Sequence, residues 1–214
     1  MGLAIPIETS ARHIHMCQED FEHLFGKGKT ITHRVDLSQP GQYACEERVT
    51  IKGPKGTFEN VALLGPFRNE TQVEISMTDS RKLGIPGIIR QSGDTKGTPG
   101  CTLLGPAGEI ELDHGVIVAK RHIHMTPVQA VQLNVKDKDE VFVIMESFER
   151  SLIFADVVVR VHPDFALAMH VDTDEANAFA GHEHPTGVIL KLFGGRTYNL
   201  RKWADELQSG INRL

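Results

Sequence analysis

The sequence predicts a mainly β protein of two small β-barrels with short capping helices, related by an internal repeat. One observation is the pentapeptide Arg12-His13-Ile14-His15-Met16, which recurs as Arg121-His122-Ile123-His124-Met125 after 109 residues (122 − 13 = 109). The other is that short apolar runs alternate with turns rich in glycine and proline. Many short strands at close spacing are typical of small barrels.

Each half is expected to begin with a strand that carries the two histidines and then continues into a short helix. Residues 2–10 are expected to form the first strand. Because side chains alternate along a strand, both histidines of His-x-His face one side and the central isoleucine faces the core. Gln18–Phe25 is expected to be helical because acidic residues stand near its start. Val128–Leu133 is expected to be helical because Thr126 can cap it and Pro127 suits its first turn.

The remaining elements are predicted from apolar runs between turns. Residues 26–41 contain few apolar side chains and are expected to be an irregular excursion or a crossover. Residues 92–100 are expected to form a loop, the strands beside Asp113-His114-Gly115 a hairpin, and residues 199–207 a closing helix. Strands are expected at Val49–Lys52, Asn60–Leu64, Thr71–Met77, Glu109–Leu112, Val116–Ala119, Glu140–Glu146, Ile153–Val161, Ala166–Val171 and Val188–Phe193.

Composition excludes several classes of protein. A net charge of −5 argues against a general nucleic-acid binder, which usually carries a basic surplus. Three cysteines without C-x-x-C spacing predict neither a disulfide framework nor a zinc ribbon. No apolar run approaches the roughly 20 residues of a membrane span, and no signal peptide precedes the first strand. The expected location is therefore the cytoplasm.

The repeat extends to a third candidate ligand in each half. Thr71–Asp79 can be laid over Ala168–Asp174, which places Glu74 opposite His170. Their separation (170 − 74 = 96) is smaller than that of the histidine pairs, so the first half carries extra residues, which we assign to 26–41. The two predicted ligand sets are His13, His15 and Glu74, and His122, His124 and His170.

Imidazole and carboxylate ligands without a thiolate suit zinc and other borderline divalent ions. Three protein ligands with one open position are typical of a catalytic zinc, and two ions could share one dinuclear site. A third His-x-His, His182-Glu183-His184, lies between glycine and proline and is interpreted as an exposed loop.

Three arginines have positions that suggest a role. Arg12 and Arg121 precede the histidine pairs and face away from them, so they could brace the fold or contact substrate, and both roles stay open. Arg68 lies in a turn six residues before Glu74, where its guanidinium could bind phosphate through two parallel hydrogen bonds.

Four motifs, in this order, resemble those of the PduL-type phosphotransacylases, also called phosphate propanoyltransferases. They are residues 10–15, 71–74, 120–127 and 170–177, and the resemblance runs through nearly the whole chain, including residues 40–49. The family implies reversible transfer of an acetyl or propanoyl group between coenzyme A and inorganic phosphate. It also implies a dinuclear zinc site between two β-barrels, with two zinc ions per chain.

The resemblance assigns roles to individual residues. Glu74, His122, His124 and His170 would hold one zinc, and His13 and His15 the other. Arg68 would be the catalytic, phosphate-binding residue. Contacts to coenzyme A would come from Thr9, Ser10, Ala11, Lys55 and Asn177. One departure is Ala62, which stands where relatives commonly carry an arginine that contacts coenzyme A.

The resemblance also implies the domain organisation and the setting. Residues 1–11 with 120–214 would form one barrel, completed by the N-terminal strand, and residues 12–119 the other. A homodimer is expected. Because only 12 residues precede His13, a microcompartment-targeting extension is not expected. A cytoplasmic enzyme linked in function to an acetate or propionate kinase is expected.

Two other functions fit the same ligands. A dinuclear zinc hydrolase of thioesters or phosphoesters would use water in place of phosphate. A non-enzymatic metal-binding barrel would only store or sense the ion. Arg68 and Lys55 argue against storage, because anion-binding groups beside metal ions have no purpose there.

Overall fold

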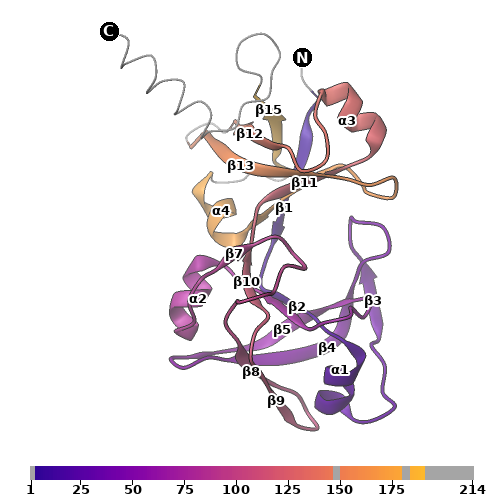
Figure 1. Cartoon of the computed structure of the whole chain (residues 1–214), viewed down its shortest axis with the longest axis vertical. Coiled ribbons are helices and arrows are strands. Elements are labelled where there is room, and N and C mark those ends of the chain that lie inside the picture. Colours follow the sequence, from indigo (N-terminus) through magenta and orange to yellow (C-terminus); the bar gives the residue numbers. More distant parts are fainter. Residues whose placement is uncertain (1–2, 147–149, 180–183, 191–214) are drawn as a thin grey trace. The chain divides into compact units, whose positions relative to one another are not determined.

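The computed structural model describes residues 3–146, 150–179 and 184–190, and the chain divides into two compact units (Figure 1). Unit 1 consists of Met1–Thr9, Arg121–Val171 and Glu175–Leu214. Unit 2 consists of Ser10–Lys120 and Asp172–Asp174. The first strand of the chain therefore belongs to the unit that is formed mainly by the second half of the sequence.

The described residues of unit 1 form a closed barrel of six strands, so none of these strands leaves an unpaired edge. Its order is β1 (Ile5–Ser10), β14 (Ala168–Asp172), β11 (His122–Met125), β13 (Leu152–Val161), β12 (Glu140–Met145) and β15 (Thr186–Ile189). The barrel closes where β1 pairs antiparallel with β15. Fully buried side chains such as Ile5, Ile123, Val143 and Met169 fill its core. Helices α3 (Pro127–Leu133) and α4 (Thr173–Ala178) follow β11 and β14 along the chain.

Unit 2 is a nine-stranded sheet that curls into a half-barrel. Its order is β7 (Ile89–Arg90), β10 (Val116–Ala119), β6 (Gln72–Glu74), β2 (His13–His15), β5 (Thr57–Gly65), β4 (Tyr43–Lys52), β8 (Cys101–Leu104) and β9 (Glu109–Leu112), with β3 (His33–Asp36) beside β4. Its core contains the buried side chains Ile14, Leu63 and Val73 of the sheet, with Phe21 from helix α1 (Gln18–Phe25) and Leu83 from helix α2 (Met77–Leu83). The predicted mainly β fold class is confirmed, with one barrel closed and the other open.

The two histidine strands have the same neighbours in both units. In unit 2, β2 pairs parallel with β5 and antiparallel with β6. In unit 1, β11 pairs parallel with β13 and antiparallel with β14. The internal repeat seen in the sequence is therefore a repeat of strand topology, and the extra residues of unit 2 include β3.

The expectation that Thr71–Met77 is a single strand was wrong. Only Gln72–Glu74 is extended, and α2 begins at Met77. A capping box causes the change, because the Ser76 hydroxyl accepts from the Asp79 N–H while the Asp79 carboxylate accepts from the Ser76 N–H.

The expected hairpin around Asp113-His114-Gly115 was also wrong, although both strands exist with the expected bounds. Strand β9 pairs with β8, whereas β10 lies parallel between β6 and β7. The continuous apolar run Val116–Val118 is buried throughout, as suits a strand in the interior of a sheet. Residues 26–41, expected to be irregular, contain the exposed strand β3.

Two of the three predicted helices are present in the described residues. Helix α1 has the expected bounds, and α3 begins at Pro127 with Thr126 and Gln129 as its capping box. The expected helix at 199–207 lies outside the described residues, as does the end of the expected strand at 188–193. Among the described residues, no helix combines the length and apolar character needed to cross a membrane.

Candidate metal centres

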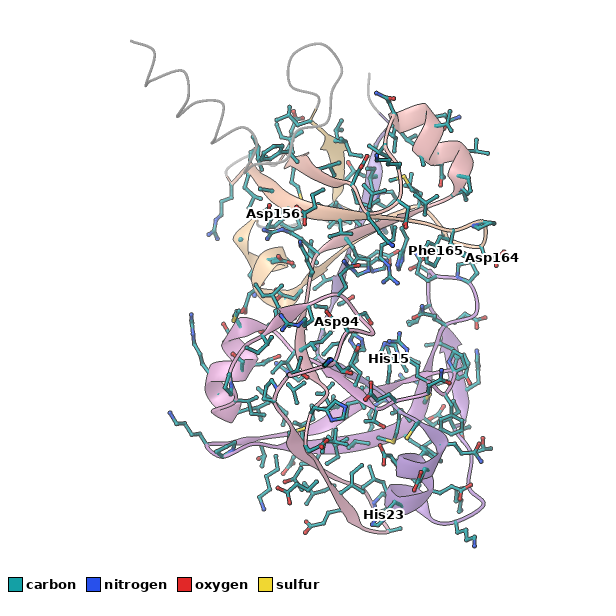
Figure 2. The ribbon with its side chains drawn as sticks, viewed as in Figure 1. His15, His23, Asp94, Asp156, Asp164 and Phe165 are labelled. Carbon is teal, nitrogen blue, oxygen red and sulfur yellow. The ribbon has the colours of Figure 1, made fainter. Side chains whose placement is uncertain are left out.

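The first group of candidate ligands lies in unit 2, on the antiparallel strands β2 and β6. Glu74 stands directly opposite His13 in the strand register. Nε2 of His13 lies 3.5 Å from Glu74 Oε2, and Nε2 of His15 lies 3.9 Å from Glu74 Oε1. One ligand atom from each of His13, His15 and Glu74 falls within 4.8 Å of the others, and all three residues are buried. We call these residues the first triad, and His15 is labelled in Figure 2.

The protonation states of the first triad suit metal binding. Nδ1 of His13 lies 2.9 Å from the carbonyl of Ala11, an arrangement that places the proton on Nδ1 and leaves Nε2 as the ligand atom. Burial and the nearby His13 lower the pKa of His15 to about 3, which keeps this ring neutral. Burial alone would raise the pKa of Glu74, but His13, His15, the Ser92 hydroxyl and Arg68 together outweigh it and lower the value to about 2. Neutral imidazoles and an ionised carboxylate are the forms that bind metal.

The second group lies in unit 1, on the antiparallel strands β11 and β14. His122 stands opposite His170 in the register, and one ring nitrogen from each of His122, His124 and His170 falls within 4.8 Å of the others. We call these residues the second triad. Burial, followed by His122 and His170, lowers the pKa of His124 to about 2. The ring of Phe165, labelled in Figure 2, covers His124 with centroids 4.2 Å apart.

The second triad contains nitrogen atoms that call for a partner. Among the described residues, both ring nitrogens of His124 are buried without a hydrogen bond. A buried polar atom left in this way costs free energy, and native proteins usually satisfy it. A metal ion would satisfy one nitrogen of the His124 ring, and two histidines plus a third imidazole or a carboxylate form a donor set that zinc accepts. The residues present therefore fit zinc.

A hydrogen-bond chain connects Glu74 to Arg68. The Ser92 hydroxyl donates to Glu74 Oε1 at 2.7 Å and accepts from Nη1 of Arg68 at 3.0 Å. It also accepts from Nε2 of Gln72 at 3.0 Å, so its one donor and two acceptor positions are all used. Gln72 Nε2 contacts Glu74 Oε1 at 2.6 Å, and the Gly93 N–H donates to Gln72 Oε1. The guanidinium of Arg68, which is predicted to bind phosphate, is thus connected through Ser92 to the candidate metal ligand Glu74.

Two charged residues lie beside the second triad. Arg160 is the register partner of His124 on β13, and its positive charge contributes to the low pKa of His124. The Glu8 carboxylate on β1 lies 3.7 Å from Nδ1 of His170, where it favours a proton on that nitrogen.

The residues predicted to contact coenzyme A are divided between the units. Thr9 and Asn177 belong to unit 1, whereas Ser10, Ala11 and Lys55 belong to unit 2. Lys55 is exposed in the turn between β4 and β5, and its backbone N–H donates to the Leu83 carbonyl. Ala62 is the register partner of His13 on β5. The sharing of Glu74 with the second triad, implied by the family resemblance, stays a prediction.

Sequence reasoning missed four residues near the triads. Gln72 carried a usable signal, since it lies two positions before Glu74 on the same strand face. No local sequence signal marked Ser92, Arg160 or Glu8, because only loop packing and strand register bring these residues to the triads. Of the third His-x-His, His182 and Glu183 lie outside the described residues.

Comparison with known proteins gives a consistent result. The model of the family described as phosphate propanoyltransferase matches residues 6–182. A phosphate propanoyltransferase of Thermotoga maritima is 58% identical over 174 residues, which are 81% of this chain and 83% of the relative. That of Salmonella typhimurium is 54% identical over 192 residues, 90% of each chain. That of Enterococcus faecalis is 52% identical over 185 residues, 86% of this chain and 87% of the relative.

Proposed function

The chain belongs to the phosphate propanoyltransferase family, and on this premise we propose how its residues carry out the reaction. The enzyme is a phosphotransacylase. In the proposal it transfers an acetyl or propanoyl group reversibly between coenzyme A and inorganic phosphate. Each triad holds one zinc ion, and the reaction requires both ions.

The observation that carries the proposal is the link from a buried triad to an anion-binding side chain. Glu74 is ionised beside two histidines, and Ser92 joins it to Arg68. A storage site has no use for a guanidinium held in this way, whereas a phosphate-using enzyme needs one. When bound, zinc would supply a Lewis acid that polarises oxygen and stabilises a departing thiolate.

Arg68 is proposed to hold the attacking phosphate. A guanidinium presents N–H donors in a planar fork that matches two phosphate oxygens. Ser92 accepts from Nη1 and thereby limits rotation of this fork. Orienting phosphate against the thioester carbonyl turns an encounter of two substrates into a reaction within one complex, which lowers the barrier.

The proposed reaction is a direct transfer in a ternary complex. A phosphate oxygen forms a bond to the thioester carbonyl carbon and the carbon–sulfur bond breaks. The proton lost from hydrogen phosphate balances the proton gained by the coenzyme A thiolate. No acyl-enzyme is required, so ping-pong kinetics or an acyl group trapped on the half-buried Cys17 would contradict the proposal.

Coenzyme A is proposed to contact Thr9, Ser10, Ala11, Lys55 and Asn177. The exposed ammonium of Lys55 suits the phosphates of that molecule. We further propose a cytoplasmic homodimer whose acyl phosphate passes to an acetate or propionate kinase. Light scattering of the purified protein tests the dimer.

The test of the activity is release of coenzyme A from acetyl-CoA and propanoyl-CoA, with and without phosphate. The assay is run on chelated and on zinc-restored protein. The proposal expects release that requires both phosphate and zinc, with one acyl phosphate formed for each coenzyme A. Release without phosphate would favour the hydrolase, and no release from either thioester would favour a metal-binding barrel.

A further inference from the structure

The arginine before each histidine pair is held by a carboxylate from a helix. Arg12 donates from Nε to Asp79 Oδ2 at 3.0 Å and from Nη2 to Asp79 Oδ1 at 2.7 Å. Arg121 donates from Nη1 to Glu175 Oε1 at 2.6 Å and from Nε to the Ala155 carbonyl at 2.7 Å. Asp79 lies on α2 and Glu175 on α4, the helices that follow the strands of the third ligands.

An aromatic ring completes the arrangement in both units. The Arg12 guanidinium carbon lies 4.1 Å from the centroid of the Phe58 ring, and that of Arg121 lies 5.1 Å from the centroid of the Phe154 ring. The two phenylalanines are 96 residues apart (154 − 58 = 96), the same separation as Glu74 and His170. Arginine, aromatic ring and helix carboxylate therefore belong to the internal repeat.

This arrangement, here called the arginine clamp, connects the two strands that carry each triad. Arg12 immediately precedes His13. Asp79 also accepts from the backbone N–H of Ser76, which is two residues after Glu74. A movement of one strand along the other would break the paired hydrogen bonds of the buried Asp79, a costly loss for a buried carboxylate. In unit 1 the clamp joins the residue before His122 to the helix that follows His170.

We propose that Arg12 and Arg121 are positioning residues, each of which sets the metal affinity of its own triad. The inference rests on the proposed function, in which both triads bind zinc. Ligand atoms must be held to within about half an ångström to bind a metal well. Loss of a residue that orients metal ligands commonly lowers affinity about 10- to 100-fold.

A clamp that merely braces the fold would behave differently. Its loss would lower the melting temperature but would leave the zinc affinity of each folded triad unchanged. A general disturbance would weaken both triads together. The property to measure is therefore whether loss of one arginine lowers the zinc affinity of its own triad and leaves that of the other triad unchanged.

The experiment isolates each triad and then removes each arginine. His122→Ala with His124→Ala leaves the first triad, and His13→Ala with His15→Ala leaves the second. Zinc affinity is measured by competition with a chromophoric chelator. Arg12→Gln is expected to weaken the first triad about 10- to 100-fold and to leave the second unchanged, and Arg121→Gln is expected to do the reverse.

Two further variants make the result decisive. Arg81→Gln removes an exposed arginine from α2 and is expected to change neither affinity. Arg12→Lys keeps the charge without the paired donors, so an intermediate loss is expected, and it replaces Arg12→Gln if that protein does not fold. Equal loss of zinc affinity in both triads would contradict the proposal that each clamp acts on its own triad. Unchanged zinc affinity with a lower melting temperature would contradict it as well. Isolated triads that bind no zinc would instead overturn the proposed function.

Discussion

Ser92→Ala removes the hydroxyl that joins the proposed phosphate-binding arginine to the first triad. Ser92 touches neither ring of the histidine pair in the hydrogen-bond network, so its loss is expected to act through Glu74 and Arg68. Glu74 keeps the donor Nε2 of Gln72 at 2.6 Å, and the zinc site should therefore persist. Arg68 loses one acceptor of its Nη1 group, which helps to limit rotation of the guanidinium.

The magnitude follows from the hydrogen bonds that are lost. Hydrogen bonds to charged groups contribute about 1.5–3 kcal/mol each, and Ser92 makes one to a carboxylate and one to a guanidinium. If one such contribution is lost from the transition state, kcat/KM for phosphate falls about 10- to 150-fold. The KM for the acyl-CoA substrate should change little, because the hydrogen bonds of Ser92 go to Arg68, Gln72 and Glu74 and to none of the residues proposed to contact coenzyme A.

The assay is steady-state kinetics with phosphate and acyl-CoA varied separately, together with zinc content. Ser80→Ala is the matched control, because it removes a buried hydroxyl that donates to the Met77 carbonyl within α2. Unchanged phosphate kinetics in Ser92→Ala would refute the reasoning. So would an equal loss for both substrates that accompanies loss of zinc.

Two other changes give further predictions. Arg68→Ala is expected to raise the KM for phosphate while zinc content stays at the wild-type level; loss of zinc in parallel would contradict the role given to Arg68. His114 pairs with Glu70 at 2.5 Å and with Asp113, and these hydrogen bonds raise the pKa of His114 above 6.5. The stabilisation from the His114–Glu70 pair is therefore fully present below pH 6.5, and it is lost as pH rises through the raised pKa of His114. At the acid end the pKa of Glu70 is lowered, so the same stabilisation is lost as pH falls below about 4.5 and Glu70 becomes protonated. Melting temperatures of wild type and His114→Gln should thus differ near pH 6 and converge near pH 9; a difference that grows with pH would reverse the assigned sign.

The histidine strands were predictable because their chemistry is local. A strand period of two places both histidines of each pair on one side, and the repeated pentapeptide marked two such strands. The alignment of Glu74 with His170 also needed no structure, and both residues lie opposite the first histidine of their pair. Capping by Thr126 and the proline after it located α3 from the sequence alone.

Other features depend on contacts that no local pattern contains. Val116–Ala119 has the composition of a strand, but its partners β6 and β7 come from distant segments, so the expected hairpin with β9 was wrong. Ser92 reaches Glu74 because a loop folds over β6, and Arg160 reaches His124 through strand register. The partners of Arg12 and Arg121 could not be predicted for the same reason, because Asp79 and Glu175 are far from them along the chain.

The central claim is that both triads bind zinc and that acyl transfer to phosphate requires both ions. It is tested most directly by titrating chelated protein with zinc while bound zinc and acyl phosphate formation are measured together. The account predicts that full activity requires two equivalents per chain. It also predicts that His13→Ala/His15→Ala and His122→Ala/His124→Ala each bind one equivalent and form no acyl phosphate. Full activity in the chelated protein, or in either single-triad variant, would contradict the account.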